Sequence, residues 1–498
     1  MEPLVILVVL VLFGLWCLRG LWSGIPGSGL LSSLGSKLFD TAFNREKQSG
    51  AHFQKERETS EWLNARNRGL ILDGAGQKRL SEETSFQHVA VISPTGAGKT
   101  TRYIAPNLLT LDDCSVIVTD PSGELYAKTS GAMASRGFAV EVLNLADPVR
   151  SLGYNPLSKL ESHGDIDKLS HVLMRSANPV VKPGDEIWYS EPQNLMAILI
   201  RCLRNTGEPE WINLHNLLFL LQNFGRDGRP LIRFIARYAP DEATVQQFKG
   251  FVSGNDKMLS SFLTMGRNAL RALNNPDIAS LLARDELDFQ RLRKRKTALY
   301  LVVPETEAEV YGFILNLFYI QFFAAQKSLE FTSDGLPIHV LYDEFGHSMI
   351  PGFDTVATTI RKYRVSLSII LQDFGQLRER YGDHAAKTIL SGGMRTKLFY
   401  PGLDVETSRM VEEMLGRVQF ETKQGRHKSV REENLLNADR VRRMEKDQAI
   451  CVTASQEPVI LKTTACYEES RMKKLMELPP CPFPAPLPSS ELRFVSLT

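Results

Sequence analysis

A short apolar stretch runs directly into a loop that contains two glycines, a lysine and two threonines. Residues 86–93 read FQHVAVIS, and the chain continues as Pro94-Thr95-Gly96-Ala97-Gly98-Lys99-Thr100-Thr101. The glycines allow the backbone to curl so that successive N–H groups point toward a bound anion, and a helix that begins after the loop adds its N-terminal dipole. A strand, this loop and a helix in this order predict a phosphate-binding loop. The competing interpretation is a Gly-rich turn that contains a lysine by chance.

The residues of this loop have separate expected roles toward ATP and its Mg²⁺ ion. Lys99 supplies positive charge at the terminal phosphates, Thr100 supplies a hydroxyl ligand for Mg²⁺, and Thr101 lies near the α-phosphate. Ser93 stands where the strict pattern G-x-x-x-x-G-K-T has its first glycine, so that pattern is incomplete. The predicted nucleotide-binding residues are Thr95, Gly96, Ala97, Gly98, Lys99, Thr100 and Thr101.

A second apolar stretch ends in two acids. Residues 338–344 read IHVLYDE, so Asp343 and Glu344 follow a predicted strand. We expect Asp343 to hold the Mg²⁺ shell and Glu344 to polarise the attacking water during hydrolysis. Asp120 also ends a predicted strand and is a rival Mg²⁺ ligand, although the following Pro121-Ser122-Gly123 favours a turn beside the nucleotide. A solvated strand end is the alternative for acids in such positions.

A third predicted strand, 366–372, ends in Gln372. Parallel strands of an α/β sheet end at the same edge, so this amide is expected near the loop and the two acids. It could bond to the terminal phosphate or its water and report hydrolysis to the rest of the molecule. The alternative is a glutamine that satisfies a neighbouring loop. Candidates for an arginine that stabilises the transition state from a neighbouring subunit are Arg361, Arg364 and Arg395.

Predicted strands and helices alternate along most of the chain. Stretches typical of strands lie at 86–93, 116–120, 139–145, 297–303, 338–343, 366–372 and 396–400, with a later hairpin at 449–454 and 459–467. Between about 158 and 290 the apolar residues recur at helical spacing instead. This pattern predicts an α/β fold with a parallel sheet and an inserted helical block. Residues 420–447 are highly charged and are expected to form a surface excursion.

The first residues of the chain predict a membrane anchor. Leu4 to Leu18 are all apolar or glycine, and residues 1–22 make a helix long enough to cross a bilayer if Arg19 extends to its surface. Only Glu2 precedes the apolar stretch, whereas the basic residues follow it, which places the body of the protein in the cytoplasm. A cleaved signal peptide is the alternative. Residues 313–323 are apolar but too few to cross, and they predict a core helix.

Composition excludes few functions. The 498 residues include 59 Lys+Arg and 57 Asp+Glu, a net charge of +2, so a polyanionic partner would need a local basic patch. Residues 201–300 have such an excess of basic residues, including the run 291–296, although a solvated helical face is an equal alternative. The run also directly precedes a predicted strand, so a loop at a domain boundary is a further alternative for it. Candidate phosphate contacts there are Arg226, Arg229, Arg233 and Arg237. The six cysteines form no CxxC pair, which indicates a reducing compartment and excludes a disulfide scaffold or a zinc site.

These expectations divide the chain into consecutive parts. They are a transmembrane anchor (1–22), a juxtamembrane linker (23–55), the first part of a nucleotide-binding domain (56–157), an all-α insertion (158–290), the second part of the nucleotide-binding domain (291–470) and a proline-rich tail (471–498).

Several motifs together resemble the TraG/TraD-type coupling ATPases of type IV secretion systems. The motifs are Gly96–Thr101 followed by IAPNLL (104–109), TDPSGEL (119–125), YNPL (154–157), LYDEF (341–345) and the stretch 372–382. The resemblance covers about residues 55–470. The chain departs from the family at Ser93, at Ser122, where the family usually has lysine, and in showing one transmembrane segment where many members have two.

The resemblance implies a RecA-like P-loop nucleotide-binding domain with an inserted all-α domain, preceded by an N-terminal transmembrane helix. It implies an inner-membrane coupling ATPase that uses ATP and Mg²⁺ and assembles as a hexamer. The implied cargo is relaxase-bound single-stranded DNA or secreted proteins, delivered to inner-membrane components of the secretion channel. The alternatives are a related membrane ATPase, such as a DNA pump of the FtsK/HerA type or a pilus-assembly ATPase, and a nucleotide-binding adaptor without significant hydrolysis.

Overall fold

The structure is a computed structural model that describes residues 47–177, 184–328, 335–347, 349–424, 427–487 and 492–497. The predicted anchor 1–22 and most of the predicted linker 23–55 therefore lie outside the described residues. These described residues divide into two compact units: one contains 47–52, 416–424 and 427–435, and the other contains the remaining described residues.

The larger unit is built around a nine-stranded sheet with the order β12-β11-β8-β2-β7-β6-β3-β5-β4. Its strands are β2 (Val89–Ile92), β3 (Ser115–Asp120), β4 (Ala139–Asn144), β5 (Thr297–Val302), β6 (Ile338–Tyr342), β7 (Val365–Leu371), β8 (Thr396–Phe399), β11 (Gln448–Thr453) and β12 (Val459–Lys462). The seven strands β4, β5, β3, β6, β7, β2 and β8, given in sheet order, pair in parallel. Strand β11 pairs antiparallel with both β8 and β12. The predicted mixed α/β fold is confirmed, and the late hairpin is β11–β12.

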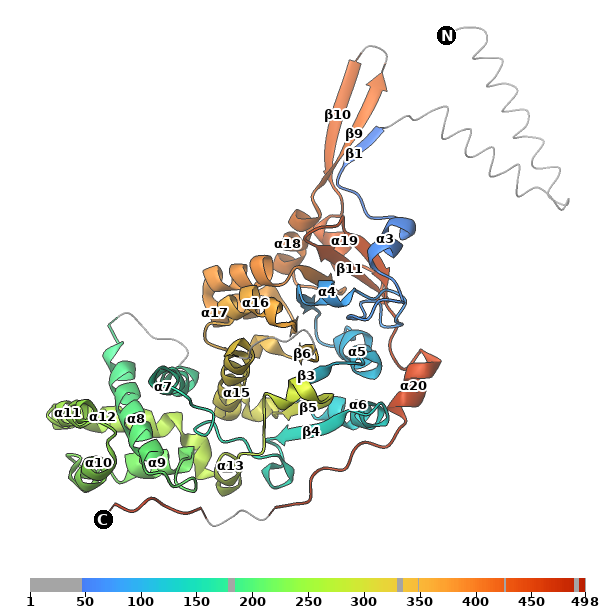
Figure 1. Cartoon of the computed structure of the whole chain (residues 1–498). Helices are drawn as coiled ribbons and strands as arrows, with labels where there is room; N and C mark the ends of the chain where they lie inside the picture. The colour runs from blue at the N-terminus through green and yellow to red at the C-terminus, as the bar shows by residue number, and fades with distance from the viewer. Residues whose placement is uncertain are drawn as a thin grey trace, which may run out of the picture. The chain divides into compact units, whose positions relative to one another are not determined.

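The central strands form because their sequences are apolar on both faces. Every residue of β3, β6 and β7 is buried, as expected for parallel strands that helices cover on both sides. Val116 and Val118 point into the core shared with α5 and α6. The opposite face of β3 is turned to α15, where the hydroxyl groups of Thr119 and Tyr319 lie 2.6 Å apart. Figure 1 shows α5 and α6 on one side of the sheet and α15 on the other.

Helices of the sheet layer surround these strands. They are α3 (Glu56–Trp62), α4 (Glu82–Ser85), α5 (Ala105–Thr110), α6 (Glu124–Ser135), α14 (Arg291–Lys294), α15 (Ala308–Ser328), α16 (Phe353–Thr359), α17 (Phe374–Lys387), α18 (Val405–Leu415), α19 (Ala438–Arg442) and α20 (Ser470–Met476). Within the described residues, α15 is the one helix long and apolar enough to cross a membrane, and 56% of its most apolar stretch is buried. Tyr319 of α15 stacks on Tyr342 of β6 at 4.8 Å, as expected of the core helix predicted at 313–323.

A block of helices separates β4 from β5, although these two strands pair in the sheet. The helices are α7 (His163–Ala177), α8 (Ile187–Asn205), α9 (Leu214–Gln222), α10 (Ile232–Tyr238), α11 (Glu242–Val252), α12 (Asp256–Ala269) and α13 (Pro276–Leu281). Asn316 of α15 donates to the Ser176 hydroxyl of α7 at 2.9 Å, so α15 lies against this block. The helices share one compact unit with the sheet, and a separate insertion domain at 158–290 stays a prediction.

The smaller unit contains a three-stranded antiparallel sheet in the order β1-β9-β10. Its strands are β1 (Lys47–Gly50), β9 (Arg417–Gln424) and β10 (His427–Asn434). The expected charged excursion at 420–447 is therefore partly a regular hairpin that begins at Arg417, and its end includes α19 of the larger unit.

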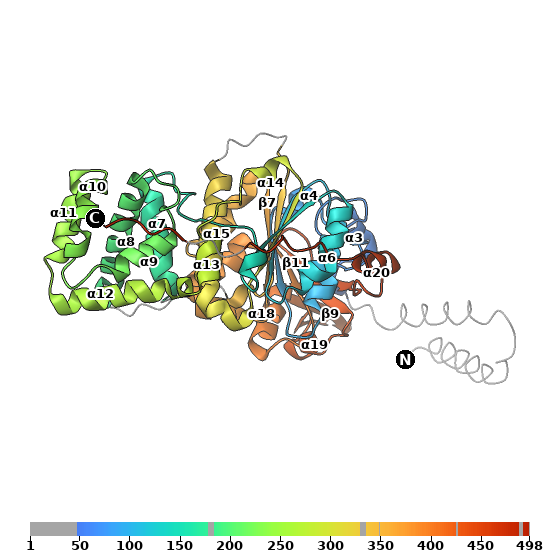
Figure 2. The ribbon, with the colours of Figure 1, turned by 90° about the horizontal axis from the view of Figure 1, so that it is seen from below.

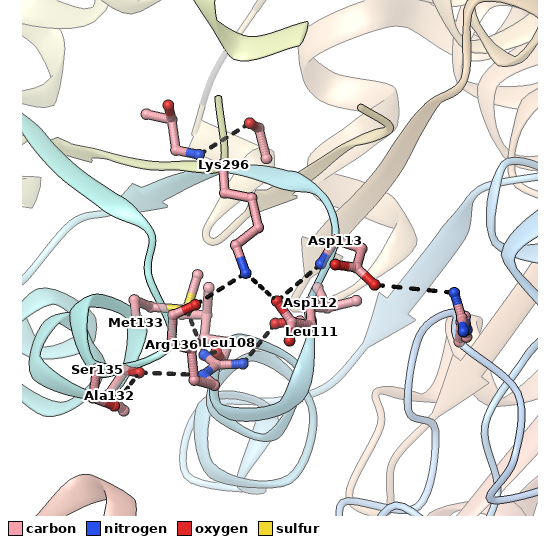
Figure 3. A network of polar contacts seen from close by, with 12 residues as sticks. Leu108, Leu111, Asp112, Asp113, Ala132, Met133, Ser135, Arg136 and Lys296 are labelled. Carbon is pink, nitrogen blue, oxygen red and sulfur yellow. Dashed lines mark hydrogen bonds and ion pairs between the residues drawn. The ribbon is translucent and has the colours of Figure 1, made fainter. Parts of the chain in front are cut away.

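The basic run 291–296 is used inside the fold. Arg291 pairs with Glu141 of β4 at 2.6 Å, and Arg293 donates to the Leu336 carbonyl at 3.0 Å, where burial lowers its pKa to about 10. Lys296 bonds to Asp112 at 2.6 Å and to the Arg136 carbonyl at 2.9 Å (Figure 3). These contacts join the sheet strands to neighbouring loops, and they favour the alternative interpretation of this run as a loop at a domain boundary.

Two of the four candidate phosphate contacts in the helical block are already paired. Arg226 contacts Asp256 at 2.7 Å, and Arg229 contacts Asp227 at 2.6 Å. The spacings of Arg229, Arg233 and Arg237 predict one shared helical face. Arg229 lies instead in the 3-10 turn η3 (Arg229–Leu231) that precedes α10, so only Arg233 and Arg237 belong to that helix. The two exposed arginines of α10 are the remaining candidates from this set.

Two buried histidines predict a pH-dependent stability. Burial lowers the pKa of His88 from 6.5 to about 3 and that of His339 from 6.5 to about 4. Because the folded values lie below the unfolded ones, the stabilisation is complete above pH 6.5 and is lost as the pH falls. We expect the free energy of unfolding to decrease by up to about 1.4 kcal/mol per pH unit for each histidine.

Urea unfolding at several pH values between 7 and 5 measures this slope. His339→Leu should make the slope shallower, because one buried titrating group is removed, while His384→Gln on the exposed face of α17 should leave it unchanged. Equal slopes in all three proteins would contradict the role given to His339.

Candidate nucleotide-binding site

The glycine-containing loop connects β2 to the helical turn η1 (Thr100–Ile104), which continues into α5. Gly96 and Gly98 have φ of +80° and +94°, backbone conformations that favour glycine. A Cβ atom at Gly96 would meet no atom within 4 Å, so the outer side of the loop is open. The Ser93 N–H donates to the Leu371 carbonyl at 2.9 Å and ties the loop to the end of β7.

Several N–H groups of the loop are free to bind an anion. Within the described chain, the N–H groups of Thr95, Gly96 and Gly98 donate to no backbone or side-chain acceptor, whereas that of Ala97 donates to the Pro94 carbonyl at 3.1 Å. The Ser93 hydroxyl is buried without a hydrogen-bond partner. Free N–H groups beside a helix N-terminus form the type of cradle that phosphate oxygens occupy.

Lys99 brings the loop and the acids together. Its side chain is largely buried, its Nζ donates to Glu344 Oε1, and the same Nζ lies 3.7 Å from Asp343 Oδ1. A buried ammonium group is stable only with such partners. The structure therefore places Lys99, Asp343 and Glu344 in one cluster, although they lie far apart in the sequence.

The two acids occupy the turn that follows β6. Glu344 has φ of +53°, which is uncommon for a residue with a side chain and costs conformational energy. Its N–H donates to Asp343 Oδ1 at 3.0 Å. Burial raises the pKa of Asp343 to about 6, Lys99 opposes this shift, and Glu344 and Asp120 add to it. Asp343 is thus a carboxylate whose negative charge lacks full compensation in the protein alone.

Gln372 contacts the same carboxylate from the other side. It follows β7, and its Nε2 donates to Glu344 Oε2 at 3.2 Å, while Lys99 contacts Oε1. Its own N–H donates to Gln376 Oε1 at 3.2 Å. The side chain therefore contacts Glu344 in the turn after β6, and its role as a sensor stays a prediction.

Asp120, the rival Mg²⁺ ligand, holds the start of α6. Its Oδ2 accepts the Tyr126 N–H at 2.8 Å, and Gly123, with φ of +73°, forms the turn before the helix. Burial raises the pKa of Asp120, and the surrounding backbone N–H groups oppose this shift. Asp120 also contributes to the raised pKa of Asp343, so it lies close enough to act on the site electrostatically.

The three candidate arginines lie at the opposite end of the parallel strands from the loop and the acids. Arg364 directly precedes β7, Arg395 directly precedes β8, and Arg361 belongs to η7 (Ile360–Tyr363) just before β7. The loop and the acids follow the ends of β2 and β6, which run parallel to these strands. Arg364 pairs with Glu82 at 2.5 Å and donates to the Gly335 carbonyl at 3.1 Å, so it has an internal function.

Arg102 also lies beside the loop, although it is not among the residues predicted for the site. Its guanidinium group donates to the Thr463 carbonyl at 2.6 Å, and a Cβ atom at Gly98 would lie 2.9 Å from its Nε. The available signal was its spacing of three residues from Lys99 at the start of a helix. Because it reaches across to residue 463, Arg102 links the loop to the segment after β12.

The donor set fits a nucleoside triphosphate with Mg²⁺. Free N–H groups and Lys99 suit phosphate oxygens, and the Thr100 hydroxyl with the Asp343 carboxylate provides oxygen ligands of the kind that Mg²⁺ prefers. In the described part of the chain, no group of three His, Cys, Asp or Glu residues could hold a metal ion. This is consistent with Mg²⁺ because that ion is usually held by one or two protein oxygens together with substrate phosphates.

Comparison with known proteins places the chain among conjugation proteins. The family model described as "Type IV secretory system Conjugative DNA transfer" matches residues 42–480. "Protein VirD4" of Rhizobium rhizogenes is 25% identical over 410 residues, which are 78% of this chain and 60% of that protein. "Conjugal transfer protein TraG" of Rhizobium radiobacter is 23% identical over 400 residues, which are 75% of this chain and 61% of that protein. The chain thus spans about 60% of the length of these relatives.

Solved structures show the same fold. The "Bacterial conjugative coupling protein TrwBdeltaN70" in its unbound monoclinic form has a TM-score of 0.65 at 15% identity, covering 85% of this chain and 95% of that chain. "Plasmid coupling protein TrwB in complex with ADP and Mg2+" has a TM-score of 0.63 at 14% identity, covering 85% and 96%. This likeness shows that the mixed α/β fold is shared with these structures.

The two rival acids should differ in their effect on stability. Asp120→Ala removes the acceptor at the start of α6 and should lower the free energy of unfolding by about 1–2 kcal/mol. Asp343→Asn should cost less than about 1 kcal/mol, because burial already disfavours its charge and Lys99 keeps Glu344 as a partner. Urea unfolding of both variants at pH 7 measures the difference, and an equal loss would contradict the capping role of Asp120.

Proposed function

The chain belongs to the family of type IV secretory system conjugative DNA transfer proteins, and from this membership we propose that it is a coupling ATPase. It binds ATP with Mg²⁺ at the ends of β2, β7 and β6, and it uses hydrolysis to deliver cargo to a secretion channel. The observation that carries the proposal is the cluster of Lys99, Glu344 and Gln372 beside a loop with free N–H groups. One of the TrwB structures is a complex with ADP and Mg2+, which supports the same choice of ligand here.

Bound ATP with Mg²⁺ supplies the phosphoanhydride bond that is hydrolysed. The chain supplies a cradle of N–H groups from Thr95 to Gly98 and the charge of Lys99. Lys99 cannot neutralise phosphates and Glu344 fully at the same time, so Glu344 Oε1 becomes available to accept a proton from water. Gln372 remains on Oε2 and keeps the carboxylate oriented.

This arrangement also suggests how hydrolysis is sensed. Gln372 lies between Glu344 and α17, because its N–H donates to Gln376 of that helix. A change in the contacts of Glu344 can therefore reach α17 through the Gln372 side chain, its backbone N–H and the Gln376 side chain. The remaining predicted roles, Thr100 and Asp343 at Mg²⁺ and Thr101 near the α-phosphate, belong to the same proposal.

The proposed cargo is relaxase-bound single-stranded DNA or secreted protein, in keeping with the names of the relatives. The proposed setting is the bacterial inner membrane, with one N-terminal span, the body in the cytoplasm and contacts to inner-membrane components of the channel. A homo-hexamer would let an arginine act on the site of a neighbouring subunit. Arg361 is the exposed member of the three candidates, since Arg364 is paired internally.

A nucleotide-binding adaptor without hydrolysis is the second candidate function. It is favoured by Ser93 in place of the first glycine of the loop motif. Against it stands Glu344, which lies beside the loop with both of its carboxylate oxygens in hydrogen bonds. A DNA pump of the FtsK/HerA type is not favoured, because the family match covers residues 42–480.

Glu344→Gln distinguishes hydrolysis from binding. The amide keeps the shape but cannot accept a proton, so ATP binding should persist while turnover falls at least about tenfold, a barrier increase of about 1.4 kcal/mol. Binding of a fluorescent ATP analogue and release of phosphate are the two measurements. Glu379→Gln, the same change at an exposed position of α17, is the control. Unchanged turnover in Glu344→Gln would contradict its role as base.

Exposed arginines of α10 test the contact with DNA. The pair Arg233→Glu and Arg237→Glu should weaken binding of single-stranded DNA, and the salt slope should fall by about 0.7 for each phosphate that the variant no longer binds. Fluorescence anisotropy with labelled oligonucleotides at several salt concentrations measures both effects. The pair Lys473→Glu and Lys474→Glu on α20 changes the net charge equally and serves as control. If both pairs behave alike, α10 makes no specific contact.

A further inference from the structure

The proline-rich tail is attached to the sheet layer through α6. The Cys481 N–H donates to the Ser130 hydroxyl at 3.0 Å, and the ring of Phe483 stacks on that of Tyr126 at 4.7 Å. Further along, the Leu487 N–H donates to the Val149 carbonyl at 2.8 Å. In Figures 1 and 2 this part of the tail leads away from α20 and α6 toward the helical block.

Residues 492–497 of the same tail lie on α9, and one side chain binds their backbone. Asn216 Oδ1 accepts the Val495 N–H at 2.9 Å, and Asn216 Nδ2 donates to the Arg493 carbonyl at 3.0 Å. The Asn216 side chain is fully buried. Asn213 caps the helix by accepting the Asn216 N–H at 2.9 Å and so holds this turn in place. An amide that bonds to residues two apart recognises an extended backbone independently of its sequence.

Three neighbouring positions of the tail add side-chain preferences. Arg493 pairs with Glu210 at 2.6 Å. Phe494 lies against the rings of His215 and Phe219, with centroids 4.9 and 4.6 Å away. Burial lowers the pKa of His215, so a neutral ring faces Phe494. Val495 is only 2% exposed. The contacts therefore favour a basic, an aromatic and an aliphatic residue in that order.

We propose that the start of α9, together with Glu210, is a recognition site for an extended peptide with the order basic, aromatic, aliphatic. The site holds Arg493–Val495 of its own chain and exchanges it for the same pattern in a partner protein. This inference does not depend on nucleotide binding, because the site lies in the helical block and shares no residue with the loop or the acids.

The geometry supports exchange rather than a permanent structural contact. The Arg493 side chain is 73% exposed and Phe494 is 52% exposed, so much of this segment stays in contact with water. An exposed ion pair adds little to affinity. The tail occupies the site chiefly because its attachment at α6 keeps it at high local concentration. A partner that presents the same pattern at sufficient concentration can therefore replace it.

The probe is a fluorescein-labelled peptide of residues 491–498, ELRFVSLT. In the full-length protein, the double change Phe494→Ala and Val495→Asp should open the site, because an unpaired carboxylate cannot occupy the buried position. The peptide should bind this opened protein at least tenfold more tightly than the wild type, in which the tail competes. Equal binding by the two proteins would overturn the proposal.

Variants of α9 then identify the site. In the opened protein, Asn216→Ala should weaken peptide binding at least tenfold, whereas Asn205→Ala, at an exposed asparagine of α8, should leave it unchanged. Thermal unfolding of each variant shows whether the helical block is intact. Peptide binding that is insensitive to Asn216→Ala in a folded protein would exclude this site.

A charge exchange tests the same site without a buried substitution. Glu210 is exposed, so Glu210→Arg should fold normally. In the opened protein this change should weaken ELRFVSLT about two- to fivefold, as expected for an exposed ion pair. The peptide that carries Arg493→Glu should restore the affinity that ELRFVSLT loses in the Glu210→Arg protein. The same peptide should bind the protein that keeps Glu210 more weakly than ELRFVSLT does. Absence of this reversal would show that Arg493 does not contact Glu210 in the bound peptide.

Discussion

The buried contact between Lys99 and Glu344 is the interaction on which the site depends. It joins the loop after β2 to the turn after β6, and β7 lies between these strands and carries Gln372 to the same carboxylate. A largely buried ammonium group requires a negative partner, so the sheet order and the ion pair support each other. The strained backbone of Glu344 is tolerated because this contact stabilises it.

Two structural connections extend from this contact. One passes through Tyr342, the residue before Asp343, which stacks on Tyr319 of α15, while Asn316 of the same helix bonds to α7. The other passes through Arg102, which bonds to residue 463, and along the chain to α20 and the tail on α6 and α9. The helical block is therefore connected to the sheet that carries the site through α15 and through the tail. Of the two connections, the one through α15 includes a direct contact with β6, which the acids follow.

Local sequence predicts which residues meet beside the loop better than it predicts the partners of the charged residues around them. The loop, the acids after 338–342 and Gln372 were found because each follows an apolar strand, and parallel strands bring their ends together. For the basic run 291–296 the sequence leaves phosphate contact, a solvated face and a domain-boundary loop open, because charge alone does not show a partner. Arg291, Arg293 and Lys296 bond to residues distant in the sequence. The same holds for Arg364, whose partner Glu82 lies far away in the chain.

The sequence by itself determined the alternation of strands and helices, the glycine-containing loop after β2 and the acids that follow β6. These depend on apolar periodicity and on glycine conformations, which are properties of neighbouring residues. Tertiary structure decided which oxygen of Glu344 meets Lys99 and which meets Gln372, that Asp120 holds α6, and that Asn216 binds the tail. Each of these is a contact between segments separated by many residues or a choice among several possible partners. Such contacts follow from packing and burial, and no local pattern encodes them.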